Sequence, residues 1–358
     1  MTAKKIRLKN FRNIQQADVE FSTGVTVLNG ENGHGKTNLL EAIYIPARGK
    51  SFRTSHENEL IRFGEDVCEI ELTYLEKWKE NKIFLRWLRQ PAGARRICLY
   101  NKAPVTRLSE LVGKFRAVFF CPDNLSLIKD GPAGRRRYLD IAISQTDGGY
   151  LRSVQKYSLL LAQRNALIKD AVIKRDENIF LSNAEIWSSQ LAEEAEKISA
   201  RRYEFTEKKS EKVNEIVSEL SSGREKVSAG YRTPKKKEEY IRLLTENMHS
   251  ELRAGMTLYG VHRDDIEINV NSMDARMFCS QGQQRTVALA MKLAEGELAC
   301  VDGSYPVYLL DDILSELDES RRKIILDGIK NRQVIISSCD RINTESRVYR
   351  VKDGKFGI

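Results

Sequence analysis

Near the start of the chain, a lysine and a threonine close a glycine-rich segment made of Gly30, Glu31, Asn32, Gly33, His34, Gly35, Lys36 and Thr37. Glycines let the backbone turn its N–H groups inward around phosphate oxygens, Lys36 adds a cation, and Thr37 offers a hydroxyl to Mg²⁺. This spacing is that of a phosphate-binding loop, but it also occurs by chance in roughly one chain of this length in several dozen. The neighbouring elements therefore decide between a nucleotide site and a coincidence.

The segments on either side of this loop have the required pattern. Val25 to Leu28 is an apolar run that predicts a strand, and the apolar-periodic segment Leu39 to Ile43 predicts a helix. Such a helix points its positive end at the phosphates. Strand, loop and helix in this order predict a nucleotide site.

Two adjacent carboxylates near the C-terminus fit the same site. The apolar run that begins at Pro306 predicts a strand that ends in Asp311 and Asp312. Adjacent residues point to different sides, so Asp311 is expected to hold Mg²⁺ beside Thr37 and Asp312 to reach the water that attacks the γ-phosphate. The alternative is a strand that simply ends in aspartates.

A second anion site is expected where Ser280 opens an apolar helix. Ser280, Gly282 and Gln283 form a tight S-x-G-Q at the helix start, and Ser280 stands at the N-cap position. An ordinary capped helix needs only the serine, so the whole segment is more specific than a cap.

The remaining pattern indicates an α/β chain with added parts. Short strands are expected in residues 1–30, an antiparallel meander in 67–100, a short strand at 118–120 and a helix from 131 to 143. Two long amphipathic helices between 150 and 220, broken near 176–182, are expected to fold back as an antiparallel arm.

The amino-acid composition indicates what kind of partner the chain binds and in which cellular compartment it is found. Lys and Arg number 59 against 50 Asp and Glu, a net charge of +9 that favours an anionic partner such as nucleic acid, although a solvated basic surface is the alternative. Six cysteines without a C-x-x-C pair are expected to be reduced core residues. Without an apolar leader or a long apolar run, a soluble cytoplasmic protein is expected.

The motifs together resemble a known family. The segment at Ser280 resembles the signature of ABC-type ATPases, and 315–318 looks like their D-loop. The loop lies near residue 30 and the other motifs after 279, as in split SMC-type heads. The blocks LKNFRN, NGENGHGKTNLLEAI, GKSFRT, GVHRDD, SQGQQR and LLDDILSELD resemble the RecF family of bacterial recombination-mediator ATPases.

That resemblance implies a fold and an activity. The fold is a P-loop NTPase of ABC/SMC ATPase-head type, with head lobe I at 1–120, an antiparallel β-subdomain within it, an inserted α-helical arm at 121–254, and the C-terminal part of the head at 255–358. The activity is a weak, DNA-stimulated ATPase that dimerises on ATP and binds duplex and gapped DNA at single-strand/double-strand boundaries. RecR, RecO and RecA are the implied partners, with ATP and Mg²⁺ as cofactors and the nucleoid as location.

The resemblance also assigns residues. Lys36 and Thr37 bind phosphate and Mg²⁺, Asp311 binds the metal and Asp312 is the base. The other nucleotide contacts, across the dimer or beside the loop, are Ser280, Gly282, Gln283, Arg12 and Asn13. The candidates for DNA contact, taken from basic segments, are Arg48, Lys50, Arg53, Arg135, Arg136 and Arg137.

Three departures from the wider ABC pattern suggest slow hydrolysis. Asp312 stands where glutamate is usual, and its shorter side chain holds water farther away. No switch histidine follows the last predicted strand, which leaves Ser337 or Ser338 as γ-phosphate sensors, and Gln145 is only a weak Q-loop candidate. A transporter-energising ATPase, another SMC-like machine and a non-catalytic scaffold are the competing interpretations.

Overall fold

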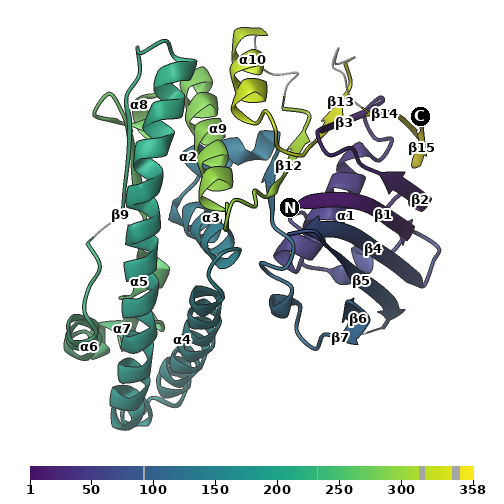
Figure 1. The fold of residues 1–358 in the computed structure, drawn as a ribbon. Coiled ribbons are helices and arrows are strands. Elements are labelled where there is room, and N and C mark those ends of the chain that lie inside the picture. The colour runs from purple at the N-terminus through teal and green to yellow at the C-terminus, as the bar shows by residue number, and fades with distance from the viewer. Residues whose placement is uncertain (92, 232, 314–318, 341–346) are drawn as a thin grey trace. The chain divides into compact units, whose positions relative to one another are not determined.

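The structure is a computed structural model that describes residues 1–358 except 92, 232, 314–318 and 341–346. It divides into two compact units (Figure 1). The first combines Met1–Asn124 with Leu289–Ile358, and the second is Leu125–Ala288. The ends of the sequence thus build one unit, and the middle builds the other.

The phosphate loop leaves from a mainly parallel sheet in the first unit. Its strand order is β15-β14-β3-β13-β12-β8, in which only the β14–β15 pair is antiparallel. The three strands β8, β12 and β13 are buried along their whole length, as expected for continuous apolar runs covered on both faces. The strands are β3 Val25–Asn29, β8 Ala117–Phe120, β12 Val307–Asp311, β13 Val334–Ser338, β14 Arg347–Lys352 and β15 Lys355–Gly357.

A second sheet of the same unit is antiparallel, in the order β2-β1-β4-β5-β6-β7. Buried and more exposed residues alternate along its central strands, so one face packs on the core and the other meets solvent. The strands are β1 Thr2–Phe11, β2 Ile14–Glu20, β4 Val67–Glu76, β5 Lys79–Gln90, β6 Gly93–Tyr100 and β7 Ala103–Pro104.

Helix α1, Lys36–Arg48, packs against strands of both sheets. Leu39, Leu40 and Ile43 of α1 are fully buried in the cluster that also contains residues of β1, β4 and β12. The helix that begins at the phosphate loop is therefore held from two sides. The other helices confined to this unit are η1 Glu57–Leu60, η2 Leu108–Glu110 and α10 Glu319–Gly328.

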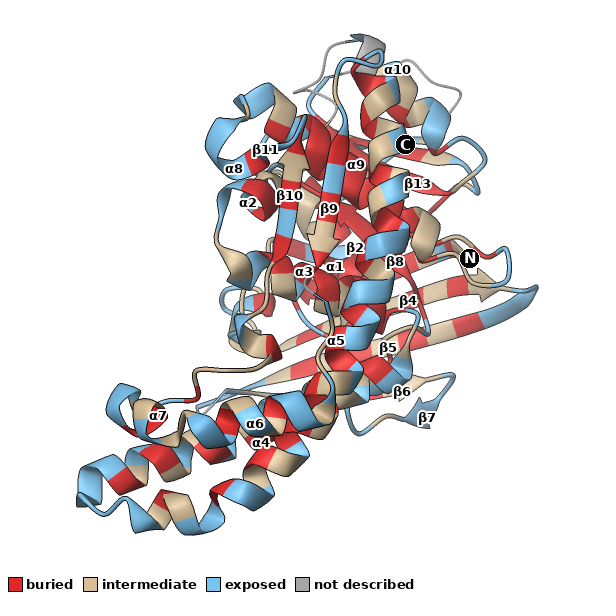
Figure 2. Ribbon diagram, turned by 90° about the vertical axis from the view of Figure 1, so that its left-hand side faces the viewer, coloured by how far each residue is buried: buried red, intermediate tan, exposed pale blue. Residues whose placement is uncertain are grey.

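The second unit is built on two long helices, α4 Gly148–Lys174 and α5 Asn178–Leu220, which pack on each other along buried stripes (Figure 2). Its small sheet has the order β11-β10-β9. Its other elements are α2 Ser126–Lys129, α3 Pro132–Ser144, β9 Val227–Tyr231, α6 Lys237–Glu246, α7 Met248–Ala254, η4 Val261–Arg263, β10 Ile266–Val270, β11 Met273–Asp274 and α8 Ala275–Phe278. Two elements run across the boundaries of the units: η3 Pro122–Leu125 and α9 Gln281–Leu298.

The expected elements are present. The strand before the phosphate loop, the meander, the strand at 117–120 and the paired long helices all form, and the break between the helices is confined to 175–177. The arm expected at 121–254 overlaps the second unit, whereas the structure groups residues up to Ala288 with it. The division of the chain into ATPase lobes remains a prediction.

Two expectations concern the compartment and the D-loop. Across the described residues, no helix is both long and apolar enough to cross a membrane. The segment expected to act as the D-loop, 315–318, lies outside the described residues.

Candidate functional site

The phosphate loop connects β3 to α1 through close backbone approaches. The N–H of Gly30 donates to Ser338 O at 3.2 Å, and a Cβ at Gly30 would collide with the carbonyl oxygen of Val351. Gly35 has φ +108°, and a Cβ there would lie 2.9 Å from Asn13 Oδ1. Glycine is thus required at both ends of the loop, because no larger residue fits the space or the backbone conformation.

Asn13 joins this loop to the first turn of α1. Its Nδ2 donates to Gly33 O at 3.1 Å, and its Oδ1 accepts from Asn38 Nδ2 at 2.8 Å. The structure therefore places Asn13 beside the loop, where the sequence resemblance expects a nucleotide contact.

Lys36 lies over the loop with its ammonium pointing inward. The side chain is buried, and Nζ donates to the carbonyl oxygens of Gly30 and, at 3.0 Å, Glu31. Nζ also lies 3.3 Å from Cys339 Sγ, just after β13. The ammonium is thus held where it could meet a phosphate.

The expectation that all the cysteines belong to the core is wrong for Cys339. This residue is exposed, whereas Cys68, Cys98 and Cys121 are buried. Cys339 follows an apolar strand in the sequence, but the strand ends at the phosphate loop, so the thiol emerges beside Lys36.

Asp311, Thr37 and Ser337 form a compact oxygen cluster. Oδ1 of Asp311 accepts hydrogen bonds from the Thr37 hydroxyl at 2.8 Å and from the Ser337 hydroxyl at 2.6 Å. Burial raises the pKa of the Asp311 carboxyl, and the charge of neighbouring Asp312 raises it further. A buried carboxylate next to a hydroxyl is a donor set that fits Mg²⁺, which relieves the cost of burying the charge.

Asp312 lies directly after the end of β12. Its backbone has φ +51°, in the left-handed region, and its N–H donates to both the carbonyl oxygen and the hydroxyl oxygen of Ser337. The side chain is half-buried. The assignment of Asp311 as the metal ligand and Asp312 as the base stays a prediction.

The structure distinguishes the two serines that were expected as sensors. Ser337 is committed to Asp311 and to the N–H of Asp312, so it positions both aspartates. Ser338 accepts instead from the N–H of Asp340 at 3.1 Å. We therefore interpret Ser337 as a positioning residue.

Sequence reasoning missed Glu41, a fully buried carboxylate on α1. Arg12 binds it through Nη2 at 2.9 Å and Nε at 3.1 Å, and the Ser51 hydroxyl donates to it at 2.5 Å. Arg53 lies 3.8 Å away and donates to Asn38 Oδ1 at 2.7 Å. The only sequence signal was a glutamate within the apolar run LLEAI.

An open groove adjoins this cluster in the first unit. Its volume is about 810 Å³, and its lining includes Asn13, Asn38, Arg53 and the fully exposed ring of Phe63. Asn13, which also donates to Gly33 O of the phosphate loop, is shared between the groove and the surroundings of the loop.

In the second unit, Ser280 caps α9 as expected. Its hydroxyl accepts from the N–H of Gln283 at 3.3 Å, and Gln283 Oε1 accepts from the N–H of Ser280 at 2.9 Å, which is a reciprocal capping box. Ser280, Gln281 and Gly282 are exposed. The start of a long helix is therefore open to an anionic partner.

The three consecutive arginines of α3 have different environments. Arg135 is buried and binds both oxygens of Asp265, at 2.6 and 2.7 Å, so its assignment as a DNA contact is corrected. Arg136 is half-buried and donates to Asp264 O at 2.7 Å, whereas Arg137 is exposed.

The remaining candidates for DNA contact, and the Q-loop candidate Gln145, differ in how far they are exposed. Lys50 is exposed, and Arg48 is half-buried and donates to Ser51 O at 3.2 Å. Gln145 is buried at the end of α3, which does not strengthen it as a Q-loop residue.

Comparison with known proteins settles the family. The family described as RecF/RecN/SMC N terminal domain matches residues 2–354. The DNA replication and repair protein RecF of Desulfitobacterium hafniense is 39% identical, with 100% of this chain and 99% of that protein covered. The chain belongs to the RecF family.

Other RecF proteins are similar to this chain over nearly its full length. RecF of Agathobacter rectalis is 38% identical, with 94% of this chain and 92% of that protein covered. The solved structure of the recombination mediator protein RecF-ATP in the RecFOR pathway has a TM-score of 0.91 and 32% identity, and covers 99% of this chain and 97% of that one.

The Smc head of Pyrococcus furiosus shares the fold alone. It has a TM-score of 0.59 and 20% identity, and covers 99% of this chain and 95% of that one. The RecF fold of this chain is therefore that of P-loop ATPase heads of the ABC and SMC type.

Proposed function

We propose that this chain is an ATP-dependent DNA-binding protein of replication and recombinational repair. It dimerises on ATP, binds duplex and gapped DNA at single-strand/double-strand boundaries, and helps to place RecA with RecR and RecO. The contact between Thr37 and Asp311, beside the buried Lys36, is the observation that carries the nucleotide part of this proposal. The names of the RecF relatives support the role in repair.

In the proposed nucleotide site, Lys36 and the loop N–H groups bind the phosphates, while Thr37 and Asp311 hold Mg²⁺. When bound, Mg²⁺ neutralises negative charge on the phosphates. Asp312 orients the attacking water and accepts its proton, and Ser337 fixes both aspartates. Because the Asp312 side chain is short, hydrolysis is slow and times the release of DNA.

The proposed dimer explains why the capped start of α9 is open. Ser280, Gly282 and Gln283 supply a hydroxyl, backbone N–H groups and a helix N-terminus, which together suit a phosphate. In the proposal, this anion-binding surface closes over the triphosphate held by the loop of a second copy. ATP thereby joins two copies, and hydrolysis separates them.

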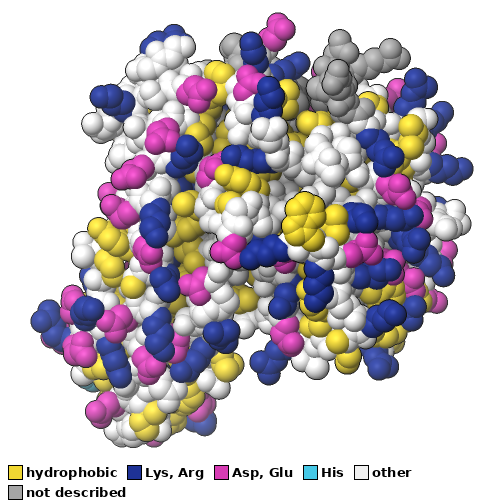
Figure 3. Space-filling view, viewed as in Figure 1, with side chains coloured by type: hydrophobic (Ala, Val, Ile, Leu, Met, Phe, Trp, Pro, Cys, Tyr) yellow, Lys and Arg dark blue, Asp and Glu magenta, His cyan; other side chains and the backbone are white. Residues whose placement is uncertain are grey.

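The proposed DNA contact is through the backbone phosphates. The net charge of +9 supports an anionic partner. Lysine and arginine side chains are interspersed with acidic ones over the face seen in Figure 3. The exposed Lys50 and Arg137, with Arg53, Arg48 and Arg136, are the proposed contacts.

The decisive experiment measures dimerisation and DNA binding together. We expect sedimentation with ATP and Mg²⁺ to give a dimer, and gel shifts to favour gapped over blunt duplex. Lys36→Arg and Ser280→Arg should abolish the effect of ATP on both. Ser182→Arg, at an exposed serine of α5 in the same unit, serves as the control for Ser280→Arg. A wild-type chain that stays monomeric with ATP at micromolar concentration would overturn the dimer.

A second measurement tests whether ATP hydrolysis controls the release of DNA. We expect DNA to stimulate ATP turnover and Asp312→Asn to prolong residence on DNA. If no turnover were detectable with DNA and the variant released DNA at the normal rate, the nucleotide would be a purely structural ligand.

A further inference from the structure

Three large apolar side chains are exposed directly before the signature serine. Met273 of β11 is 52% exposed, and Met277 and Phe278 of α8 are 72% and 68% exposed. Exposed apolar side chains that gather in one short segment are typical of a contact surface rather than of ordinary surface variation. Figure 2 shows the outer turn of α8 in the exposed colour.

This segment is fixed to the start of α9. The side chain of Asp274 accepts from the N–H groups of Arg276 and Met277, both at 2.9 Å, and so caps α8. From one turn into α9, Gln284 Nε2 donates to Ala275 O at 3.0 Å and to Arg276 O at 3.3 Å. Ala275 is fully buried. The apolar side chains are thus held outward in a set position relative to Ser280.

We propose that Met273, Met277 and Phe278 form an apolar contact surface for a second copy of this chain. The inference rests on the proposed ATP-dependent dimer. Phe278 precedes Ser280 by two residues, which span at most about 7 Å of backbone. Any partner surface that reaches the Ser280 hydroxyl therefore comes within a side-chain length of Phe278, so the two contacts are continuous.

The first unit of the second copy offers an apolar counterpart beside its own phosphate loop. Phe63 is 99% exposed and lines the groove that Asn13 and Asn38 also line. Burial of Met277 and Phe278 against the second copy would remove apolar surface from water, which stabilises the dimer beyond the phosphate contact. ATP positions the two copies, and the apolar surface adds affinity once they are aligned.

The test compares a double variant with a matched control in the full chain. Met277→Ser with Phe278→Ser removes most of the apolar surface, and Ile186→Ser removes an exposed apolar side chain from α5 in the same unit. We expect the double variant to weaken ATP-dependent dimerisation by about tenfold or more, because buried aromatic side chains dominate interface affinity. The control should dimerise normally, and ATP affinity of the dilute monomer should be unchanged in both.

The outcomes separate this inference from the proposed function. If the wild type and the double variant dimerise equally on ATP, the inference is overturned while the proposed dimer stands. If the wild type stays monomeric, the proposed dimer and this inference both fail. If the double variant melts at a lower temperature, Met277→Ser alone decides: weakened dimerisation supports the contact, and unchanged dimerisation overturns it.

Discussion

The hydroxyl of Thr37 donates to Asp311 Oδ1 at 2.8 Å, although the two residues are 274 positions apart in the chain. Strand β13 pairs in parallel with both β3 and β12, so the carboxyl ends of β3 and β12 lie at the same edge of the sheet. A helix start and a strand end thus meet at one pair of oxygen ligands.

Replacing Asp311 by Asn should abolish turnover and stabilise the metal-free protein. Burial raises the Asp311 pKa, so folding favours the protonated form, and this group lowers stability as the pH rises through the folded-state pKa. At neutral pH without Mg²⁺, the neutral amide removes that cost while its oxygen still accepts from Thr37 and Ser337. We expect turnover to fall by about 100-fold or more and the melting temperature to rise. A lower melting temperature would contradict the account.

Ser337→Ala should slow hydrolysis more than it weakens ATP binding. The hydroxyl of Ser337 donates to Asp311 and accepts from the N–H of Asp312, so its loss changes the two aspartates rather than the phosphate loop. We expect turnover to fall by about tenfold, with little change in ATP affinity. Ser338→Ala is the control, since neighbouring strand residues face opposite sides. Equal effects of the two variants would argue against a positioning role.

Cys339 should report occupation of the phosphate loop. Its thiol is exposed and lies 3.3 Å from Lys36 Nζ, so bound phosphates and an ordered Lys36 would shield it. We expect ATP with Mg²⁺ at ten times its Kd to slow maleimide labelling of Cys339 by about tenfold. Labelling is located by mass spectrometry of peptides, and Lys36→Ala should lose the protection. Protection at a different cysteine would place the nucleotide elsewhere.

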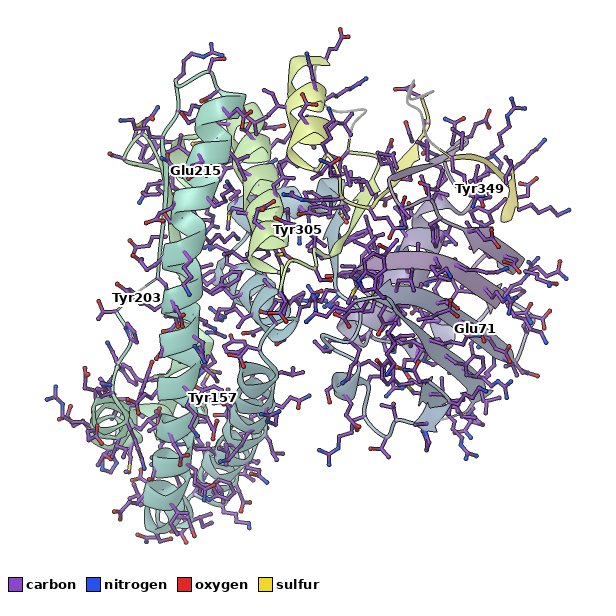
Figure 4. The ribbon with its side chains drawn as sticks, in the orientation of Figure 1. Glu71, Tyr157, Tyr203, Glu215, Tyr305 and Tyr349 are labelled. Carbon is purple, nitrogen blue, oxygen red and sulfur yellow. The ribbon has the colours of Figure 1, made fainter. Side chains whose placement is uncertain are left out.

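His262 should make the second unit less stable in mild acid. Burial lowers its pKa to about 4 from 6.5, and its ring bonds to Tyr157 of α4 (Figure 4) and to Thr257 O. The unfolded state therefore takes up a proton first, so stability is lost as the pH falls from 6.5 toward 4, by up to about 3 kcal/mol. Urea unfolding should show a shallower pH dependence for His262→Gln. An unchanged slope would mean that His262 is not the titrating group.

Arg135 and Arg137 should separate folding from DNA binding. Arg135→Ala leaves Asp265 without its bidentate partner, so we expect a loss of about 3 kcal/mol in stability. Arg137 is exposed, so Arg137→Ala should leave stability within about 0.5 kcal/mol. It should also weaken DNA binding in gel shifts and reduce the dependence on salt. If Arg137→Ala bound DNA normally, the proposed contact would lie elsewhere.

Local patterns predicted the elements that carry the site. The strand before the phosphate loop, the helix from Lys36 and the cap at Ser280 each depend on residues a few positions apart, so the sequence revealed them. Two other features could not be predicted from local sequence patterns, because each depends on a contact between distant parts of the chain. Which of three consecutive arginines turns inward depends on Asp265, 130 positions later. Which serine faces Asp311 depends on the register that pairs Asp311 with Ser337.

The position of β3 between β13 and β14 has a consequence for how the phosphate loop is assembled. Both hydrogen-bonded neighbours of this strand come more than 300 positions after it in the sequence. Bringing such distant segments together costs chain entropy before any of these hydrogen bonds form. The strand that carries the phosphate loop is therefore expected to join its sheet late in folding, after the segment that contains β13 and β14 has reached it.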